Sequence, residues 1–212
     1  MYFYYPDSAD LIGEHLPDVK LIFLLRNPID RAFSDYWHEN RFGFKKSIFP
    51  NFDVMAKENH PRFQHYRNVS SYKKHLGKYY SLFPKENILV MLFDDFVADT
   101  PGAVKQICEF LNVDSEYEFD FERKSNQFIE PRFGWLQRAM EKVSFSGIGR
   151  NMPIFLRRPL GKVKQVVRRV GSSNKRPEMS SELRAELVPR FEEDIAYVEE
   201  LLGRDLSHWR EV

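Results

Sequence analysis

The stretch that decides the fold is residues 20–36, which read KLIFLLRNPIDRAFSDY. It opens with a continuous apolar run, which is typical of a strand buried on both faces of a parallel sheet. Asn27 suits the N-cap of a following helix, Pro28 its first helical position, and Asp30 the positive end of the helix dipole. We therefore predict a strand over 20–25, followed directly by a helix that runs to about residue 41.

A similar unit follows later in the chain. A helix over about 71–83 ends before Pro84, a second buried strand covers 88–93, and Pro101 opens a further helix. Strands that alternate with helices in this order predict an α/β fold with a parallel sheet.

The remaining segments show weaker patterns. Residues 44–65 are polar and are predicted to be irregular. After residue 120 the pattern is mostly helical, with helices expected at 132–145, 153–170 and 181–202. Pro189 should kink or shorten the last of these helices, because proline has no backbone N–H to donate.

Length and composition bound the class of protein. A chain of 212 residues with 42% hydrophobic residues is predicted to form one globular domain over 1–212. The single cysteine, Cys108, excludes a disulfide framework, and the histidines show no ligand spacing, so no metal site is expected. No apolar run is long enough for a membrane span. A cytoplasmic location is the default expectation, with a Golgi enzyme separated from its anchor as the alternative.

Charge is concentrated in one block. Residues 142–177 contain ten Lys or Arg residues and no Asp or Glu, although the whole chain has a net charge of only +1. Such a block faces an anionic partner or is simply a solvated face. One hypothesis is therefore a non-catalytic protein that binds an anionic ligand through the 142–177 block, with peripheral membrane contact as a variant.

Arg26 and Ser34 are the first candidate site residues. Arg26 follows the predicted strand at its carboxyl end, where ligands bind in open α/β sheets. The next helix points its N–H groups at the same crevice, and Ser34 lies about two turns along it. A guanidinium, helix N–H groups and a hydroxyl together can hold a phosphate. From these residues alone, it is equally possible that Arg26 is an ordinary surface arginine and Ser34 a small packing residue.

The pattern Arg26-Asn27-Pro28-x-x-Arg31-Ala32-x-Ser34-x-Tyr36 resembles the 3′-phosphate-binding strand-loop-helix of the sulfotransferase superfamily. It is most similar to the heparan-sulfate-type and bacterial branches. Further similar segments follow in order, at 72–90, 94–101, 107–113, 126–132 and 201–209. The resemblance implies a P-loop-like three-layer α/β sandwich with a central parallel sheet and a helical C-terminal part.

The resemblance also implies a function. The family transfers a sulfuryl group from 3′-phosphoadenosine 5′-phosphosulfate (PAPS) to a hydroxyl or amine, here of a glycan or small molecule, and not to nucleic acid. Arg26 and Ser34 would hold the 3′-phosphate of this nucleotide, and no metal is needed. Arg176 lies about where many relatives place a basic loop against the same phosphate.

The chain departs from the family pattern at its beginning. Only 19 residues precede the strand at 20–25, and none matches the Lys-Ser/Gly-Thr-Thr loop that holds the 5′-phosphosulfate. We therefore expect a truncated domain that lacks the first β-α unit and is inactive by itself, and we assign no catalytic residue. Asp94 and Asp95 follow a strand like the magnesium aspartate of nucleotide triphosphatases, with Asp95 expected to act as a cap or turn residue. No Walker loop accompanies them, which disfavours a kinase.

Overall fold

The computed structural model describes residues 3–5, 7–40, 51–121, 130–131, 172–173 and 178–212. The chain divides into two compact units, a first unit of residues 1–34, 55–124 and 179–212 and a second unit of residues 35–54 and 125–178. The helices predicted at 132–145 and 153–170 lie outside the described residues. Most of the 142–177 block lies outside them as well.

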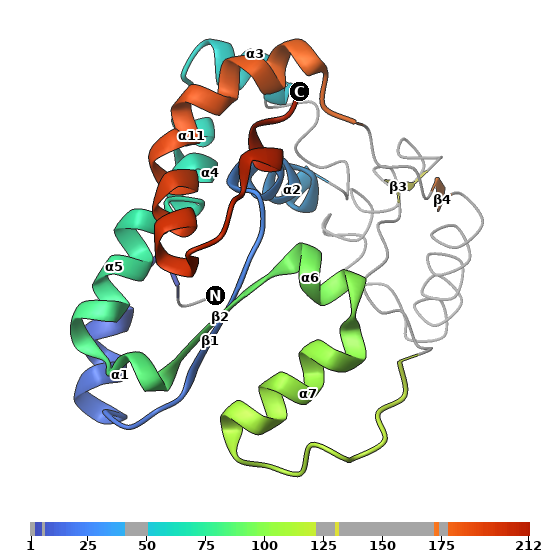
Figure 1. Ribbon diagram of the computed structural model, residues 1–212. Helices are drawn as coiled ribbons and strands as arrows, with labels where there is room; N and C mark the ends of the chain where they lie inside the picture. Colours follow the sequence, from blue (N-terminus) through green and yellow to red (C-terminus); the bar gives the residue numbers. More distant parts are fainter. Residues whose placement is uncertain (1–2, 6, 41–50, 122–129, 132–171, 174–177) are drawn as a thin grey trace, which may run out of the picture. The chain divides into compact units, whose positions relative to one another are not determined.

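The first unit is built on two parallel strands. β1 (Leu21–Leu25) pairs with β2 (Ile88–Leu92) in parallel, with Leu21 opposite Ile88 and Leu25 opposite Leu92. The two strands lie side by side in Figure 1. Both predicted strands and their parallel pairing are thus confirmed, and with them the α/β class.

Helices fill the chain between and around these strands. They are α1 (Ser8–His15), α2 (Pro28–Asn40), α3 (Phe52–Lys57), α4 (Pro61–Val69), α5 (Tyr72–Leu82), α6 (Phe93–Ala98), α7 (Thr100–Leu111) and α11 (Ser181–Leu202). The short helices η1 (Lys85–Asn87) and η2 (Ser207–Arg210) and the two-residue antiparallel pair β3 (Glu130–Pro131) and β4 (Ser172–Ser173) complete the described elements. Among the described helices, none combines the length and apolarity that a membrane span requires.

One face of the sheet carries the core of the first unit. Leu25 and Leu92 pack with residues of α5 and α11, and α1 covers the start of the strands through Ala9. Figure 1 shows α5 and α11 on the same side of the strand pair. Burial of aliphatic and aromatic side chains here supplies the main driving force for folding.

The other face of β1 is exposed in the part of the chain that the structure describes, so the prediction of burial on both faces is wrong there. Ile22 and Leu24, which alternate with the core-facing residues, are 38% and 45% exposed. Successive side chains of a strand point to opposite faces, so a strand covered on one side only leaves every second residue accessible. An all-apolar sequence carries no alternation from which this could be read.

Two helices occupy the segment that was predicted to be irregular. α4 begins at Pro61, and the ring of His60 caps it by accepting a hydrogen bond from the Arg62 N–H at 3.2 Å. Phe63, Tyr66 and Val69 form its buried side at a spacing of three residues. The prediction failed because polar residues dominate the composition of this segment, while the few apolar residues at helical spacing decide its structure.

The final helix matches its prediction. Ser180 caps α11 by accepting from the Leu183 N–H at 3.3 Å, and Gly203 ends it with a φ of 59°, a conformation that glycine adopts without strain. Pro189 lies inside the helix and does not shorten it. Figure 1 shows α11 changing direction along its length, as expected where proline removes a backbone hydrogen bond.

Candidate anion-binding site

The end of β1 is held by a buried asparagine. Asn27 is 5% exposed, and its side-chain oxygen accepts a hydrogen bond from the Ile29 N–H at 3.0 Å. This confirms Asn27 as the cap of α2. It also means that the Ile29 N–H already has a partner, so the prediction that the helix start offers free N–H groups is wrong at this position.

The backbone of Arg26 is fixed by Tyr72. The Tyr72 hydroxyl donates to the Arg26 carbonyl at 2.8 Å and accepts from the Arg26 N–H at 3.2 Å. Burial raises the pKa of Tyr72 to about 12, so the phenol keeps the proton that it donates. Sequence reasoning missed this residue as part of the site, because Tyr72 stands out there only as the start of a helix.

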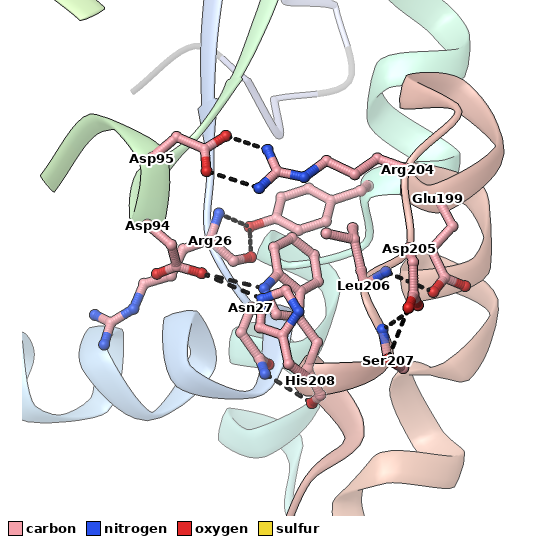
Figure 2. Close-up of polar contacts among 12 residues, drawn as sticks. Arg26, Asn27, Asp94, Asp95, Glu199, Arg204, Asp205, Leu206, Ser207 and His208 are labelled. Atoms are coloured by element: carbon pink, nitrogen blue, oxygen red, sulfur yellow. Dashed lines mark hydrogen bonds and ion pairs between the residues drawn. The ribbon is translucent and has the colours of Figure 1, made fainter. Parts of the chain in front are cut away.

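The guanidinium of Arg26 itself has no polar partner among the described residues. It lies over the ring of Phe93, 5.3 Å from the ring centroid, and the side chain is partly exposed. Figure 2 shows the backbone N–H and carbonyl of Arg26 both engaged in hydrogen bonds. A cation on a fixed backbone, with no described residue bonded to its N–H donors, is suited to bind an anion.

The other residues of the pattern have distinct places. Ser34 is partly exposed in α2, and Arg176 lies outside the described residues. Arg31 is structural, since its guanidinium donates to the Val69 carbonyl and to the Ser70 hydroxyl, the latter at 3.2 Å. The roles of Ser34 and Arg176 stay predictions.

The end of β2 carries acidic residues that are already paired. Asp95 binds the Arg204 guanidinium through both carboxylate oxygens. Asp94 accepts from the Trp209 indole N–H at 3.2 Å, and the His208 ring lies 3.9 Å from the same oxygen. Asp95 therefore forms an ion pair, and the prediction of a cap or turn role for its side chain is wrong. Within the described ranges, no group of three His, Cys, Asp or Glu residues could hold a metal ion.

The C-terminal segment reaches both strand ends. Residues 204–210 supply Arg204 and Trp209 to the end of β2, and the Trp209 carbonyl accepts from the Asn27 side chain at 2.8 Å at the end of β1. Figure 2 shows Arg204 paired with Asp95 at the end of β2. The site is thus a turn whose backbone is held on two sides, and the Arg26 guanidinium that projects from it has no hydrogen bond to a described residue.

A protein-family model matches the segment that contains this site. The model described as the sulfotransferase domain matches residues 10–197. The chain belongs to the sulfotransferase family. The matched region includes β1, α2 and β2, so the strand-loop-helix described above is part of a sulfotransferase domain.

Individual relatives agree with this membership. The chain is 27% identical over 156 residues to Sulfotransferase 2A1 of Rattus norvegicus, covering 66% of this chain and 53% of the rat protein. It is 28% identical over 122 residues to Heparan sulfate glucosamine 3-O-sulfotransferase 6 of Mus musculus, covering 53% of this chain and 33% of the mouse protein.

A solved structure supports the fold. The crystal structure of a sulfotransferase from Alicyclobacillus acidocaldarius matches 99% of this chain and 65% of its own with a TM-score of 0.66 and 26% identity. The resemblance to both the heparan-sulfate-type and the bacterial branches is confirmed. This chain spans about half the length of the rat relative and about two thirds of the bacterial one.

Proposed function

We propose that this sulfotransferase chain holds the 3′-phosphate of PAPS with Arg26 and Ser34, and that the protein transfers the sulfuryl group to a hydroxyl or amine. The observation that carries the proposal is the guanidinium of Arg26. It stands at the carboxyl end of a parallel strand on a backbone that Tyr72 and Asn27 fix, and no described residue forms a hydrogen bond with it. Ligands bind at this edge of open α/β sheets.

The residues present suit a phosphate. Arg26 offers a planar fork of N–H donors that matches two phosphate oxygens, and Ser34 offers a hydroxyl from the helix that follows. The Asp94 and Asp95 carboxylates nearby are already bonded by Trp209 and Arg204, which lowers their repulsion of an anion. When bound, PAPS would supply the sulfuryl group that is transferred.

The acceptor is proposed more coarsely. The name of the mouse relative describes a 3-O-sulfotransferase of heparan sulfate glucosamine, which supports a hydroxyl-bearing glycan as one acceptor class. A hydroxylated small molecule is the other class. A non-catalytic anion-binding role for the 142–177 block gains no support from the family relation, and a cytoplasmic location stays a prediction.

Binding is tested by comparing two nucleotides that differ only at the 3′ position. Calorimetric titration with adenosine 3′,5′-bisphosphate should give an affinity about 10- to 150-fold higher than titration with adenosine 5′-monophosphate. A charge-assisted contact to one phosphate contributes about 1.5–3 kcal/mol, which corresponds to this range. Equal affinities would show that no 3′-phosphate site exists at Arg26.

Transfer is tested separately. The protein is incubated with labelled PAPS and a panel of hydroxylated glycans and small molecules, with heat-denatured protein as the control, and labelled product is counted. Label in one acceptor class identifies the substrate class. This chain alone is expected to give no labelled product, because no segment before β1 matches the loop that holds the 5′-phosphosulfate. Binding of the bisphosphate without transfer by a longer form that contains such a loop would contradict the transfer step and retain the nucleotide site.

A further inference from the structure

The hydrogen bond between Asn27 and Trp209 joins the turn after β1 to the C-terminal segment, beside the proposed nucleotide site. The Asn27 side-chain N–H donates to the Trp209 carbonyl at 2.8 Å, and these residues are 5% and 1% exposed. The amide oxygen of Asn27 is bonded to the Ile29 N–H at the same time. Both polar ends of the amide are therefore engaged, which fixes its orientation and that of the turn.

Trp209 is itself held firmly in place. Its ring belongs to the core cluster that contains Leu25, Tyr72 and Leu92. Its indole N–H donates to Asp94 at 3.2 Å, which attaches it to the end of β2. The Trp209 carbonyl is therefore a rigid acceptor for Asn27.

The residue that follows ties the same segment to α11. The Arg210 guanidinium donates to both carboxylate oxygens of Glu192, at 3.0 and 3.1 Å from Nε, and to both of Glu199 at 2.8 Å. These contacts lower the pKa of both glutamates, so they stay charged at neutral pH. Glu199 also accepts from the Leu206 N–H at 2.9 Å. Figure 2 shows Glu199 next to Leu206.

We propose that Trp209 is a positioning residue for nucleotide binding, because its carbonyl, acting through Asn27, fixes the turn from which Arg26 projects. The proposal rests on the proposed function. Tyr72 holds the Arg26 peptide from α5, and Trp209 holds the next residue from the C-terminal segment. A bidentate contact depends on placement within about 0.5 Å, so a turn held by one of these contacts alone would bind phosphate less well.

Coupling of this kind works in both directions. If the Trp209 contact strengthens nucleotide binding, then bound nucleotide must stabilise the Trp209 contact by the same free energy. A residue with a purely structural role would be protected by the ligand only as much as the rest of the core, through the overall stabilisation that any ligand of the folded state gives. Amide exchange of residues 205–210, compared with that of core amides elsewhere in the first unit, is therefore a readout that separates positioning from stability.

The test compares Asn27→Ser with Ile195→Val in the full chain. Serine keeps an acceptor for the Ile29 N–H, since it is a good N-cap, and loses the donor that reaches Trp209. Ile195 is fully buried on α11 in the same core cluster, so its shortening destabilises the fold without touching the turn. Both variants are titrated with adenosine 3′,5′-bisphosphate at a temperature where circular dichroism shows them folded.

We expect Asn27→Ser to weaken binding about tenfold, as the loss of one buried hydrogen bond would. Ile195→Val should bind like the unaltered chain. The bisphosphate should slow amide exchange of residues 205–210 in the unaltered chain and in Ile195→Val, and do so less in Asn27→Ser. Equal affinities of the two variants, or amide exchange at 205–210 that added ligand slows no more than it slows core amides elsewhere in the first unit, would overturn this inference and leave the proposed function in place. Absence of binding by the unaltered chain would overturn the proposed function and this inference with it.

Discussion

The carboxyl ends of β1 and β2 lie next to each other, but the charged side chains at the two ends differ in their hydrogen bonding. At the end of β1, the backbone of Arg26 is bonded on both its polar groups while its guanidinium has no hydrogen bond to a described residue. At the end of β2, the Asp94 and Asp95 carboxylates are bonded by Trp209 and Arg204. All three are charged groups at the edge of one sheet, yet only the Arg26 guanidinium has no hydrogen-bond partner in the part of the chain that the structure describes.

This difference separates a binding residue from a structural one. A charge that folding has already paired loses an interaction when a ligand takes its partner, whereas an unpaired charge on a fixed backbone loses little freedom on binding. By this criterion the charge proposed to bind the ligand is that of Arg26, whereas the two aspartates are held in contacts within the fold. Three substitutions test the distinction.

The largest effect is expected for Arg26→Ala. It should lower the affinity for adenosine 3′,5′-bisphosphate about 10- to 150-fold, because it removes a charge-assisted bidentate contact. Stability should change little, since the contact that the structure describes for the guanidinium is the one with the Phe93 ring. Calorimetric titration and thermal unfolding measure the two quantities on one preparation.

Lys105→Ala is the matched control for this charge. Lys105 lies on α7, pairs with Glu116 at 2.7 Å and is exposed, so its removal changes the net charge equally and leaves the strand ends intact. Its affinity for the bisphosphate should match that of the unaltered chain. If both variants weakened binding to the same degree, the effect of Arg26 would be one of overall charge and not of a site.

Ser34→Ala should have a smaller effect of about tenfold. A neutral hydroxyl supplies one hydrogen bond and no charge, so its loss costs less than that of a guanidinium. The check is a comparison of ligands: the substitution should weaken binding of adenosine 3′,5′-bisphosphate and leave that of adenosine 5′-monophosphate unchanged. A larger loss of affinity for Ser34→Ala than for Arg26→Ala would show that the phosphate-binding residues are assigned wrongly.

Much of the fold follows from local sequence. The apolar runs at 20–25 and 88–93 predicted both strands, and Ser180 and Gly203 mark the bounds of α11, because strand hydrophobicity and helix caps are properties of short segments. Arg26 could be named as a candidate for the same reason, since a cation directly after a buried strand falls at the ligand-binding edge.

The parts that sequence did not predict are contacts between distant segments. The bond from Tyr72 to Arg26 spans 46 residues, and that from Asn27 to Trp209 spans 182. Tyr72 and Trp209 read as ordinary core aromatics, because nothing local reports which backbone group their polar atoms reach. The open face of β1 is hidden for a similar reason: apolar residues look alike whether or not another layer covers them.

The smallest effect is expected for the ion pair at the end of β2. Arg204 and Asp95 are both about half-exposed, and exposed pairs typically contribute about 0.2–1 kcal/mol. Arg204→Gln should therefore lower the free energy of unfolding by no more than about 1 kcal/mol at low salt. In about 1 M salt, where the Debye length falls to about 3 Å, the loss should shrink.

A double-mutant cycle with Asp95→Asn isolates the pair from other effects of each substitution. If the charges only stabilise the strand end, the coupling free energy measured by denaturant unfolding should account for most of the Arg204→Gln loss. Affinity for the bisphosphate should stay within about threefold throughout the cycle, since tenfold corresponds to about 1.4 kcal/mol, more than this exposed pair contributes. A fall in affinity as large as that of Arg26→Ala would place Arg204 in the anion site and remove the distinction between the two strand ends. A fall that Asp95→Asn restores would instead show that the unpaired aspartate repels the ligand, and that Arg204 serves binding by neutralising it.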